Sequence, residues 1–482
     1  MTASRVIRVF WPELILIGIL AGILRAFAAR GELWLDEIWS LAMVRQTIKN
    51  PIEIITVLKL DNNHFINSLW IWFQPDSALD FDFRLLSILA GSLGVMFAAA
   101  VCSQHGRLSM WFGAIIIGTS YLQVHYSSEA RGYGPLCAAV LGAVWLDQKS
   151  RQSPGIIWEV LYSVSCVSGF LAHAAFLQYW LPAVLLTCWS FFRPRPTSPS
   201  GQNYVLITAQ VVFRIALPGA WFLWIWRTNL SQMQVAGGSV VAYWKVIVDT
   251  MSLSVGVSPG LPAAAIGAGI MLILSLFVVR FLLKTEPNDA FLLIFSTVVV
   301  PAILLLVMNR QDIYPRYFLI GTLLFQLSLA RWIASLLETE DGPLRRYQQL
   351  AGGALLVAFV AANATLDRQQ IVLQRGHYED AIRWLQDHAE SERILLGVDH
   401  PFRHRFPLGY YVARTEIGER LQLATRSEQV PDWLLVHDLN RIAQPSETVT
   451  SATGVQFRLQ KIFRTAPLSG WNLLIYRRDN SE

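Results

Sequence analysis

Long blocks of apolar residues, nearly free of charge, constrain this chain more than any other feature of its sequence. A window of about 19 residues, the length of a membrane-spanning helix, finds these blocks up to about residue 366 of the 482-residue chain. They lie near residues 9–28, 84–102, 109–126, 133–147, 156–174, 176–192, 204–226, 261–283, 290–308, 316–336 and 349–366. The sequence therefore predicts an α-helical polytopic membrane protein with about eleven transmembrane helices.

Composition supports this class, since 54% of the residues are hydrophobic and only 15% are charged, against about 25% charged in soluble domains. The net charge of +5 is scattered among the apolar blocks without a basic stripe, which argues against a nucleic-acid partner. The four cysteines lie within or beside apolar blocks and lack ligand or redox spacing, so we interpret them as buried apolar side chains.

Basic residues in alternate short connections orient the predicted helices. The positive-inside rule places these connections, with the N-terminus, in the cytoplasm: Arg107, Lys149, Arg151, Arg193, Arg195, Lys284, Arg345 and Arg346. An odd number of spans then puts the chain's tail on the extracytoplasmic side. We expect a multi-pass protein of the bacterial inner membrane.

The last part of the chain, residues 367–482, has the character of a soluble domain. An amphipathic stretch at 377–386 precedes strand-like runs at 393–398, 432–436 and 471–476. We therefore expect a transmembrane domain over 1–366 and a periplasmic or lumenal α/β domain over 367–482.

Two extracytoplasmic segments, 29–83 and 227–260, are unusually long, and long loops of this kind are usually functional. In the first segment, 37–48 and 64–73 are amphipathic but too short to span, so we expect helices lying at the membrane interface. Asp36 and Glu37 follow the first span between tryptophans. They suit a general base that acts on an acceptor hydroxyl or amine, or simply the first turn of a helix, where the helix dipole favours acids.

The same loop contains Asp61 and His64. This pair has weak metal-ligand spacing, and an N-cap by Asp61 or Asn62 accounts for it more simply. Arg84 begins the second span, where it either snorkels to the interface or binds a ligand.

Further charged residues lie in later extracytoplasmic turns. Glu129, Arg131 and Tyr133 surround Gly132, which allows a close backbone approach; a Glu–Arg pair closing the turn is the structural alternative. His173 is expected to be a satisfied polar residue.

Arg310 and Arg316, beside Tyr317, have the composition of an anion site, because arginine binds phosphate oxygens through two N–H groups. Positive charge is expected to be scarce on this face, and several exceptions together indicate a bound anion. A lipid phosphate entering from the membrane fits these charges.

These motifs, in this order, resemble the GT-C glycosyltransferases, closest to the protein O-mannosyltransferase and aminoarabinose-transferase branches. The resemblance rests on Asp36-Glu37, Asn62–Trp70, Phe83–Ile88, Glu129–Tyr133, Tyr314–Tyr317 and His377–Leu385. It implies inverting transfer of a hexose or pentose from a polyprenyl-phosphate donor to a lipid, glycan or protein acceptor. Asp36 would be the base and Glu37 its support, with Arg131, Arg316, Arg84, Arg310 and Tyr317 on the phosphate and His64, Asp61, Glu129 and Tyr133 on the substrate. The family's His-Pro-Pro or Glu-Lys pair is absent at Asn63-His64-Phe65, which leaves the sugar open.

A transporter or flippase of lipid-linked sugars would also need extracytoplasmic arginines, although such proteins more often show internal symmetry and interrupted helices. A receptor-like sensor would not account for the charges at the membrane. No group of residues has the spacing of a metal site, so no obligatory metal or cofactor is expected.

Overall fold

The computed structural model describes residues 3–192, 202–234, 242–308, 313–339, 343–415, 418, 420–424, 430–439, 441, 444–451 and 454–479. The chain divides into two compact units. One, the helical unit, consists of Met1–Ala29 and Ile48–Arg368, and the other, the sheet unit, consists of Arg30–Thr47 and Gln369–Glu482. The segment between the first span and residue 48 thus belongs to the same compact unit as the tail.

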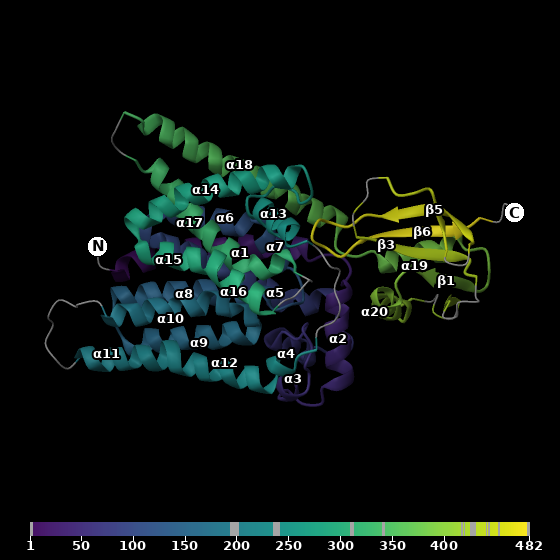
Figure 1. The fold of residues 1–482 in the computed structure, drawn as a ribbon, viewed down its shortest axis with the longest axis horizontal. Coiled ribbons are helices and arrows are strands. Elements are labelled where there is room, and N and C mark those ends of the chain that lie inside the picture. Colours follow the sequence, from purple (N-terminus) through teal and green to yellow (C-terminus); the bar gives the residue numbers. More distant parts are fainter. Residues whose placement is uncertain are drawn as a thin grey trace. The chain divides into compact units, whose positions relative to one another are not determined.

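Helices dominate the described part of the helical unit (Figure 1). The longer ones are α1 (Ala3–Ala28), α5 (Asp80–Cys102), α6 (Arg107–Thr119), α8 (Tyr133–Gln152), α9 (Ile156–Ala172), α10 (Leu177–Phe192), α12 (Leu217–Thr228), α13 (Tyr243–Ser254), α14 (Ala263–Thr285), α17 (Leu319–Leu337) and α18 (Arg345–Leu373). The shorter ones are α3 (Glu53–Thr56), α4 (Phe65–Phe73), α7 (Tyr121–Tyr126), α11 (Gln202–Gln210), α15 (Pro287–Ile294) and α16 (Val300–Met308).

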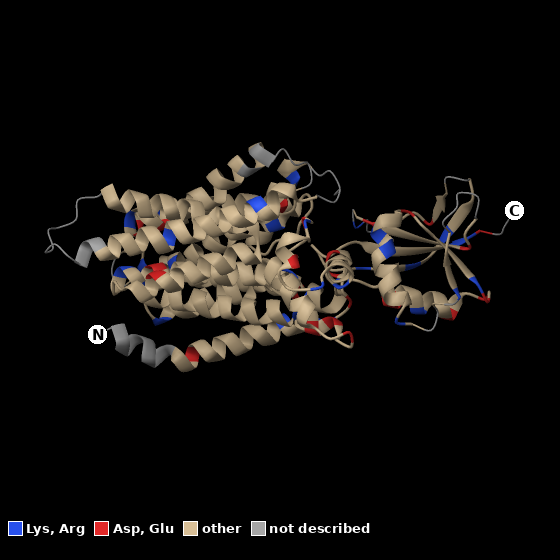
Figure 2. Cartoon of the chain, turned by 90° about the horizontal axis from the view of Figure 1, so that it is seen from below, with Lys and Arg blue, Asp and Glu red and all other residues tan. Residues whose placement is uncertain are grey.

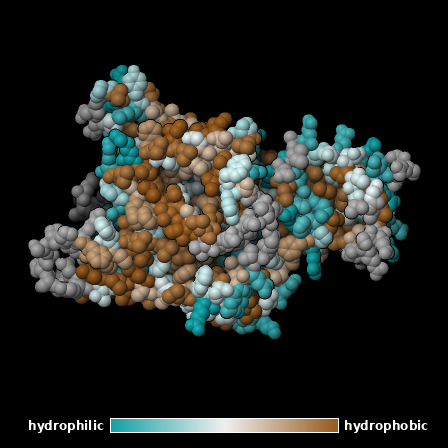
Figure 3. All heavy atoms as spheres, viewed as in Figure 1, coloured by the Kyte–Doolittle hydropathy of each residue, from teal (hydrophilic) through white to brown (hydrophobic). Residues whose placement is uncertain are grey.

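Among the described residues, seven helical segments are long and apolar enough to cross a membrane. They are Trp11–Ala28, Asp80–His105, Ala174–Phe192, Val205–Gln232, Ala263–Thr285, Pro315–Leu337 and Arg345–Leu373. Shorter apolar helices lie at Arg107–Thr119, Ile156–Ala172 and Pro287–Ile303, and α8 covers the remaining predicted block. Charged residues gather near both ends of these helices (Figure 2), and the visible surface of the unit is largely hydrophobic (Figure 3). The predicted mostly helical fold is confirmed.

One predicted span is wrong in detail, because the helix expected over 109–126 is interrupted at Ser120. Its extended backbone (φ −64°, ψ 120°) separates α6 from α7. The Tyr121 N–H exposed by the break donates to Asn363 Oδ1 at 2.8 Å, and Gln326 Nε2 donates to Ser120 Oγ at 2.8 Å. Polar side chains of α17 and α18 thus satisfy the groups that a helix end leaves open.

Small residues let the inner helices pack closely. A Cβ added at Gly134 in α8 would clash with the carbonyl oxygen of Ser87 in α5, at 2.7 Å. Small residues allow this close approach of helix backbones in membranes. Helix α17 is central, since 83% of its apolar window is buried within the protein.

The sheet unit contains a six-stranded mixed sheet of order β2-β1-β3-β6-β5-β4. Strand β1 runs parallel to β2 and β3, whereas the β3–β6, β6–β5 and β5–β4 pairs are antiparallel. The strands are β1 (Ile394–Val398), β2 (Leu421–Leu423), β3 (Trp433–Asp438), β4 (Thr448–Thr450), β5 (Gln456–Phe463) and β6 (Asn472–Arg478). The helices are α2 (Leu35–Thr47), α19 (Tyr378–His388) and α20 (Pro401–Val412).

The three predicted strand-like runs are confirmed as β1, β3 and β6, and the amphipathic stretch is confirmed as α19. Strands β2, β4 and β5 and helix α20 were not predicted from the sequence. The predicted helices at 37–48 and 64–73 correspond to α2 and α4.

Glu32 joins the 30–47 segment to the rest of the sheet unit. Its carboxylate accepts hydrogen bonds from the backbone N–H groups at the start of α19, from Tyr378, from Glu379 at 2.9 Å and from Asp380 at 3.2 Å. Burial raises the pKa of Glu32 to about 7, against the opposing effect of these N–H donors. Nearby, the Tyr411 hydroxyl donates to the Leu33 carbonyl oxygen at 3.2 Å.

Candidate functional site

Several predicted site residues of the helical unit come together where α8 begins and α9 ends. We call His64, Arg131, Tyr133, His173 and Arg316 the imidazole–arginine cluster. The His64 ring stacks on the His173 ring with centroids 4.9 Å apart, and both rings contact Tyr133, at 5.3 and 5.1 Å. His64 is 3% exposed, and its Nε2 makes no hydrogen bond with the described residues.

Two arginines border these rings. The Arg131 Nη2 donates to Asn62 Oδ1 at 2.6 Å, and its guanidinium lies 5.0 Å from the Tyr133 ring centroid. Arg316 sits in a 3₁₀ turn, Pro315–Phe318, with its guanidinium 4.3 Å from the Tyr314 ring and 5.8 Å from the Tyr317 ring.

The 3₁₀ turn that carries Arg316 is fixed to α10, because Gln178 Nε2 donates to the Tyr317 carbonyl oxygen at 2.6 Å. The other arginine predicted in this turn, Arg310, lies outside the residues that the structure describes.

The arginines set the charge of the cluster. Burial lowers the pKa of His64 well below its usual value, and the positive charge of Arg131 and Arg316 lowers it further, as does His173. Burial and the same two arginines lower the pKa of His173 to about 3. Both imidazoles are therefore neutral at pH 7 while the guanidinium groups stay charged. This combination suits an anionic group with several oxygens.

The backbone of the turn at 127–132 is held tightly beside the cluster. A Cβ on Gly132 would lie 2.1 Å from the Ala172 carbonyl oxygen and 3.0 Å from His64 Cβ, so the predicted close approach is confirmed. Asn67 Nδ2 donates to the Ala130 carbonyl oxygen at 2.6 Å, and Ser87 Oγ donates to that of Arg131 at 2.7 Å. These contacts fix the position of Arg131.

The predicted N-cap by Asp61 or Asn62 is wrong. Helix α4 begins at Phe65 with His64 as its N-cap, and no side chain caps it. Asn62 Oδ1 instead accepts a hydrogen bond from Arg131 Nη2. Asn63 Nδ2 donates to the Ile54 and Leu58 carbonyl oxygens, both at 2.7 Å. Tertiary contacts with a neighbouring loop therefore outweigh the local capping preference.

Glu129 and Arg84 also have contacts that differ from the simplest expectations. The Glu129 carboxylate lies 3.1 Å from His125 Nε2, with both side chains buried. Arg84 is fully buried, so the snorkelling expectation is wrong, and its Nη1 donates to the Ala29 carbonyl oxygen at 2.8 Å. Arg84 thus stabilises the end of α1, whose last carbonyls lack helical partners.

In the sheet unit, Asp36 and Glu37 occupy the first turn of α2, as the helix-start interpretation expects. Glu37 is 1% exposed, and its Oε2 accepts a hydrogen bond from the Trp34 N–H at 3.1 Å, which is one half of a capping box. Asp36 is half-buried. Of the two acids, Asp36 therefore has the more accessible carboxylate.

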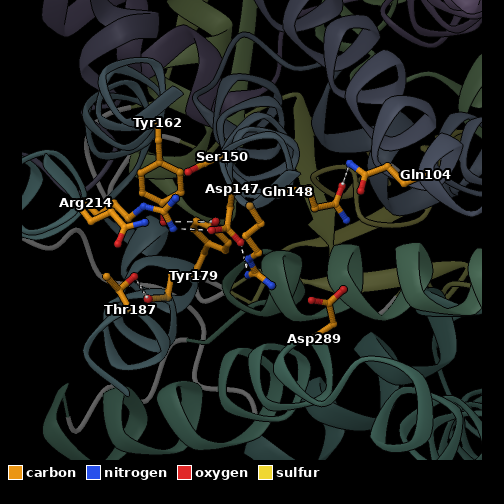
Figure 4. Close-up of polar contacts among 12 residues, drawn as sticks. Gln104, Asp147, Gln148, Ser150, Tyr162, Tyr179, Thr187, Arg214 and Asp289 are labelled. Carbon is orange, nitrogen blue, oxygen red and sulfur yellow. Dashed lines mark hydrogen bonds and ion pairs between the residues drawn. The ribbon is translucent and has the colours of Figure 1, made fainter. Parts of the chain in front are cut away.

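A second polar region lies at the other ends of α8 and α9, where a cavity of about 250 Å³ opens between α8, α10 and α15. Arg214 reaches it from a π-helical turn, Val211–Ala216, and such turns are frequent at functional sites. Arg214 donates to Asp147 (Figure 4). It also donates to Glu159, and Arg151 pairs with Asp147. Sequence analysis did not single these residues out, although acids within predicted spans are a recognised signal.

Charges in this second region are matched by partners of opposite sign. Glu159 is fully buried and also accepts a hydrogen bond from Ser150 Oγ at 2.5 Å. Close by, Arg331 pairs with Asp289 at 2.7 Å and with Glu286. We therefore interpret the region as a structural ion network.

No family model and no curated protein sequence matches the chain. Among solved structures, the chain is similar over its full length to ArnT from Cupriavidus metallidurans. With the apo structure, sequence identity is 11% and the TM-score 0.48, over 96% of this chain and 97% of that one. With the structure bound to undecaprenyl phosphate the identity and TM-score are the same, over 100% and 99%. Because the sequence identity and the TM-score are this low, the function is inferred from this chain's own residues.

Proposed function

We propose that this protein transfers a sugar from a polyprenyl-phosphate donor to an acceptor on the extracytoplasmic side of a membrane. The observation that carries the proposal is the imidazole–arginine cluster. There the positive charges of Arg131 and Arg316 both lower the pKa of His64 and of His173, whose rings are neutral. A phosphodiester matches this charge, and the apolar spans beside it suit a polyprenyl tail. The motif resemblance to the GT-C glycosyltransferases supplies the donor class.

In the proposed reaction, Asp36 takes the proton from the acceptor's hydroxyl or amine group. The acceptor atom attacks the anomeric carbon from the face opposite the phosphate, so the new bond forms with inverted configuration. The bond between the anomeric carbon and the phosphate oxygen breaks, and the lipid phosphate leaves with its electron pair. Arg131 and Arg316 stabilise this anion electrostatically, which is usually the largest contribution in such sites.

Other residues have supporting roles in the proposal. Glu37 fixes the start of α2 and hence the backbone of Asp36. Further phosphate contacts are proposed for Arg84, Arg310 and Tyr317, and substrate contacts for His64, Asp61, Glu129 and Tyr133.

The broken helix at Ser120 favours a different candidate, a flippase of lipid-linked sugars, because transporters often use interrupted helices. A flippase would move the donor across a bilayer without consuming it. The two candidates therefore differ in whether the glycosidic bond to phosphate is broken.

Replacing the base tests the proposal. Purified protein in nanodiscs is given synthetic polyprenyl-phosphate pentose and hexose donors with a membrane-extract acceptor, and released polyprenyl phosphate is measured. We expect Asp36→Asn to lower the transfer rate by about 10²–10⁴-fold, the usual contribution of a general base, with donor affinity unchanged. Asp387→Asn changes an exposed acid in the same unit and is the matched control.

Full transfer activity in the Asp36→Asn protein would refute the base assignment. Donor movement across proteoliposomes by the wild-type protein, without release of polyprenyl phosphate from any donor, would favour the flippase.

A further inference from the structure

Two histidines and an aspartate that the proposed reaction does not use meet in the sheet unit. Asp399 directly follows β1, His404 lies in the first turns of α20, and His437 lies near the end of β3. Because β1 and β3 are parallel neighbours, their carboxyl ends lie at the same edge of the sheet. Ligands of α/β sheets bind outside this edge.

The three side chains are close enough to share one ion. The distance between Asp399 Oδ1 and His404 Nε2 is 2.8 Å, and Asp399 Oδ2 contacts His437 Nδ1. All the potential ligand atoms lie within 4.8 Å of one another. Ligands of tetrahedral zinc, bound at about 2.0–2.1 Å, are separated by roughly 3.3 Å. Binding of an ion therefore requires the carboxylate to move away from the His404 ring.

His404 is also held in place from outside the group. His404 is fully buried, and its Nδ1 lies 3.1 Å from the Tyr378 hydroxyl, which accepts a hydrogen bond from Trp471 Nε1 at 3.1 Å. Within the group, the backbone N–H of His437 donates to Asp399 Oδ2 at 3.2 Å. Fixing the remote nitrogen of a histidine in this way is characteristic of metal ligands.

We propose that Asp399, His404 and His437 bind a divalent transition-metal ion of the zinc class, with the fourth position open. Two imidazoles and one carboxylate with an open position are a ligand set that zinc uses. In the structure His404 Nε2 donates to Asp399 Oδ1, and Asp399 Oδ2 contacts His437 Nδ1. Ion binding shifts the His404 proton to Nδ1, toward the Tyr378 hydroxyl, and the His437 proton to Nε2. No electron transfer is involved.

Arg403 opposes the ion and so provides a specific test. Its guanidinium contacts His437 Nε2 and lies 5.8 Å from the Trp471 ring centroid. When the His437 proton moves to Nε2, Arg403 must turn away from the ring. Removing this charge should tighten metal binding, whereas a purely structural cluster would gain no affinity for a cation.

The separation of the ligands along the chain explains why this site was not predicted from the sequence. Asp399 and His404 are separated by a strand-to-helix turn, and His437 comes from the next parallel strand along the sheet. Only the pairing of β1 with β3 brings them together.

The first experiment uses the full-length protein in detergent, stripped with EDTA and dialysed against zinc chloride. Mass spectrometry of the metal content should show about one zinc ion per chain. Asp399→Asn and His437→Gln should each lower zinc affinity by at least tenfold, while His388→Gln, an exposed histidine of the same unit, should not. Absence of saturable zinc binding by the wild-type protein, or wild-type affinity in both ligand variants, would overturn the proposal.

Two variants that gain a signal keep the test decisive if a ligand variant fails to fold. Arg403→Gln should bind zinc several-fold more tightly than the wild-type protein. His437→Cys, loaded with cobalt chloride, should show a thiolate-to-cobalt charge-transfer band that the wild-type protein lacks. Cobalt binding to His437→Cys without that band, or unchanged zinc affinity in Arg403→Gln, would contradict the proposed ligand geometry. None of these readouts depends on sugar transfer.

Discussion

The two ends of α8 and α9 use the same residue types for different purposes. At one end, Arg131 and Arg316 surround two neutral imidazoles, and Arg131 donates to an uncharged amide oxygen. At the other end, roughly 20 Å along α8, Arg214 is matched by Asp147 and Glu159. A buried arginine by itself therefore indicates little about function. The two ends differ instead in the groups packed around the arginines, which are stacked imidazole and phenol rings at one end and the carboxylates of Asp147 and Glu159 at the other.

The first prediction concerns the ion network. Arg214→Gln should have the largest effect on stability. It leaves the buried Glu159 without its charged partner, which typically costs about 3–5 kcal/mol. The free energy of unfolding of the helical unit, measured in detergent with denaturant, should fall by that amount. Donor affinity of the protein that remains folded should stay within about twofold of the wild-type value.

Combining Arg214→Gln with Glu159→Gln removes both charges and should recover a large part of the stability. If the single variant were as stable as the wild-type protein, the network would have no structural role.

Arg316→Gln tests the imidazole–arginine cluster. It should weaken donor binding and leave stability nearly unchanged. Loss of a charged hydrogen bond to phosphate is worth about 1.5–3 kcal/mol, so we expect donor affinity to fall about tenfold to a hundredfold, with little change in stability. Lipid binding can be measured with a fluorescent polyprenyl-phosphate analogue. Arg227→Gln, an exposed arginine at the end of α12, should bind like the wild-type protein. Unchanged donor affinity in Arg316→Gln would remove the main support for the proposed function.

The smallest expected effect concerns pH. The pKa of folded His173 is about 3, while an unfolded histidine titrates near 6.5. Between these values the unfolded chain binds a proton that the folded chain does not, so stability falls as the pH falls below about 6.5.

His173→Asn keeps the side-chain acceptor that caps the Ala175 N–H but cannot titrate. Between about pH 7 and pH 5 it should lose about 1 kcal/mol less stability than the wild-type protein, after allowance for the partial exposure of His173. Equal losses in both proteins would show that His173 protonates normally in the folded state.

Sequence reasoning located the elements better than it located the contacts. The apolar blocks and the three buried strand runs reflect burial that each segment shows locally, so they were predicted. The break at Ser120 was not predicted, because Gln326 and Asn363 come from segments more than 200 residues away. For the same reason the sequence suggested an N-cap for Asn62, whose real partner is Arg131.

Within the candidate site, residue types were easier to predict than their roles. Arg131 and Arg316 were selected because charges near a membrane need an explanation, whereas His64 was selected for its spacing from Asp61 and for the motif resemblance. The structure brings the three together. His173 was expected to be only a satisfied polar residue, since nothing in the local sequence indicates that its ring stacks on His64. Asp147 and Glu159 were missed because each is the only acid within its apolar block.

The hydrogen bonds between the Glu32 carboxylate and the N-terminus of α19 have a consequence for the order in which the protein folds during synthesis. The two partners are separated by 346 residues, so Glu32 emerges from the ribosome long before the backbone groups that it binds. Until residues 369–482 have been synthesised, the stretch that contains Asp36 has none of its partners in the rest of the sheet unit. The acid is therefore positioned only at the final stage of biogenesis, and a chain cut short before residue 378 would contain every helix of the bundle but an unfinished first loop.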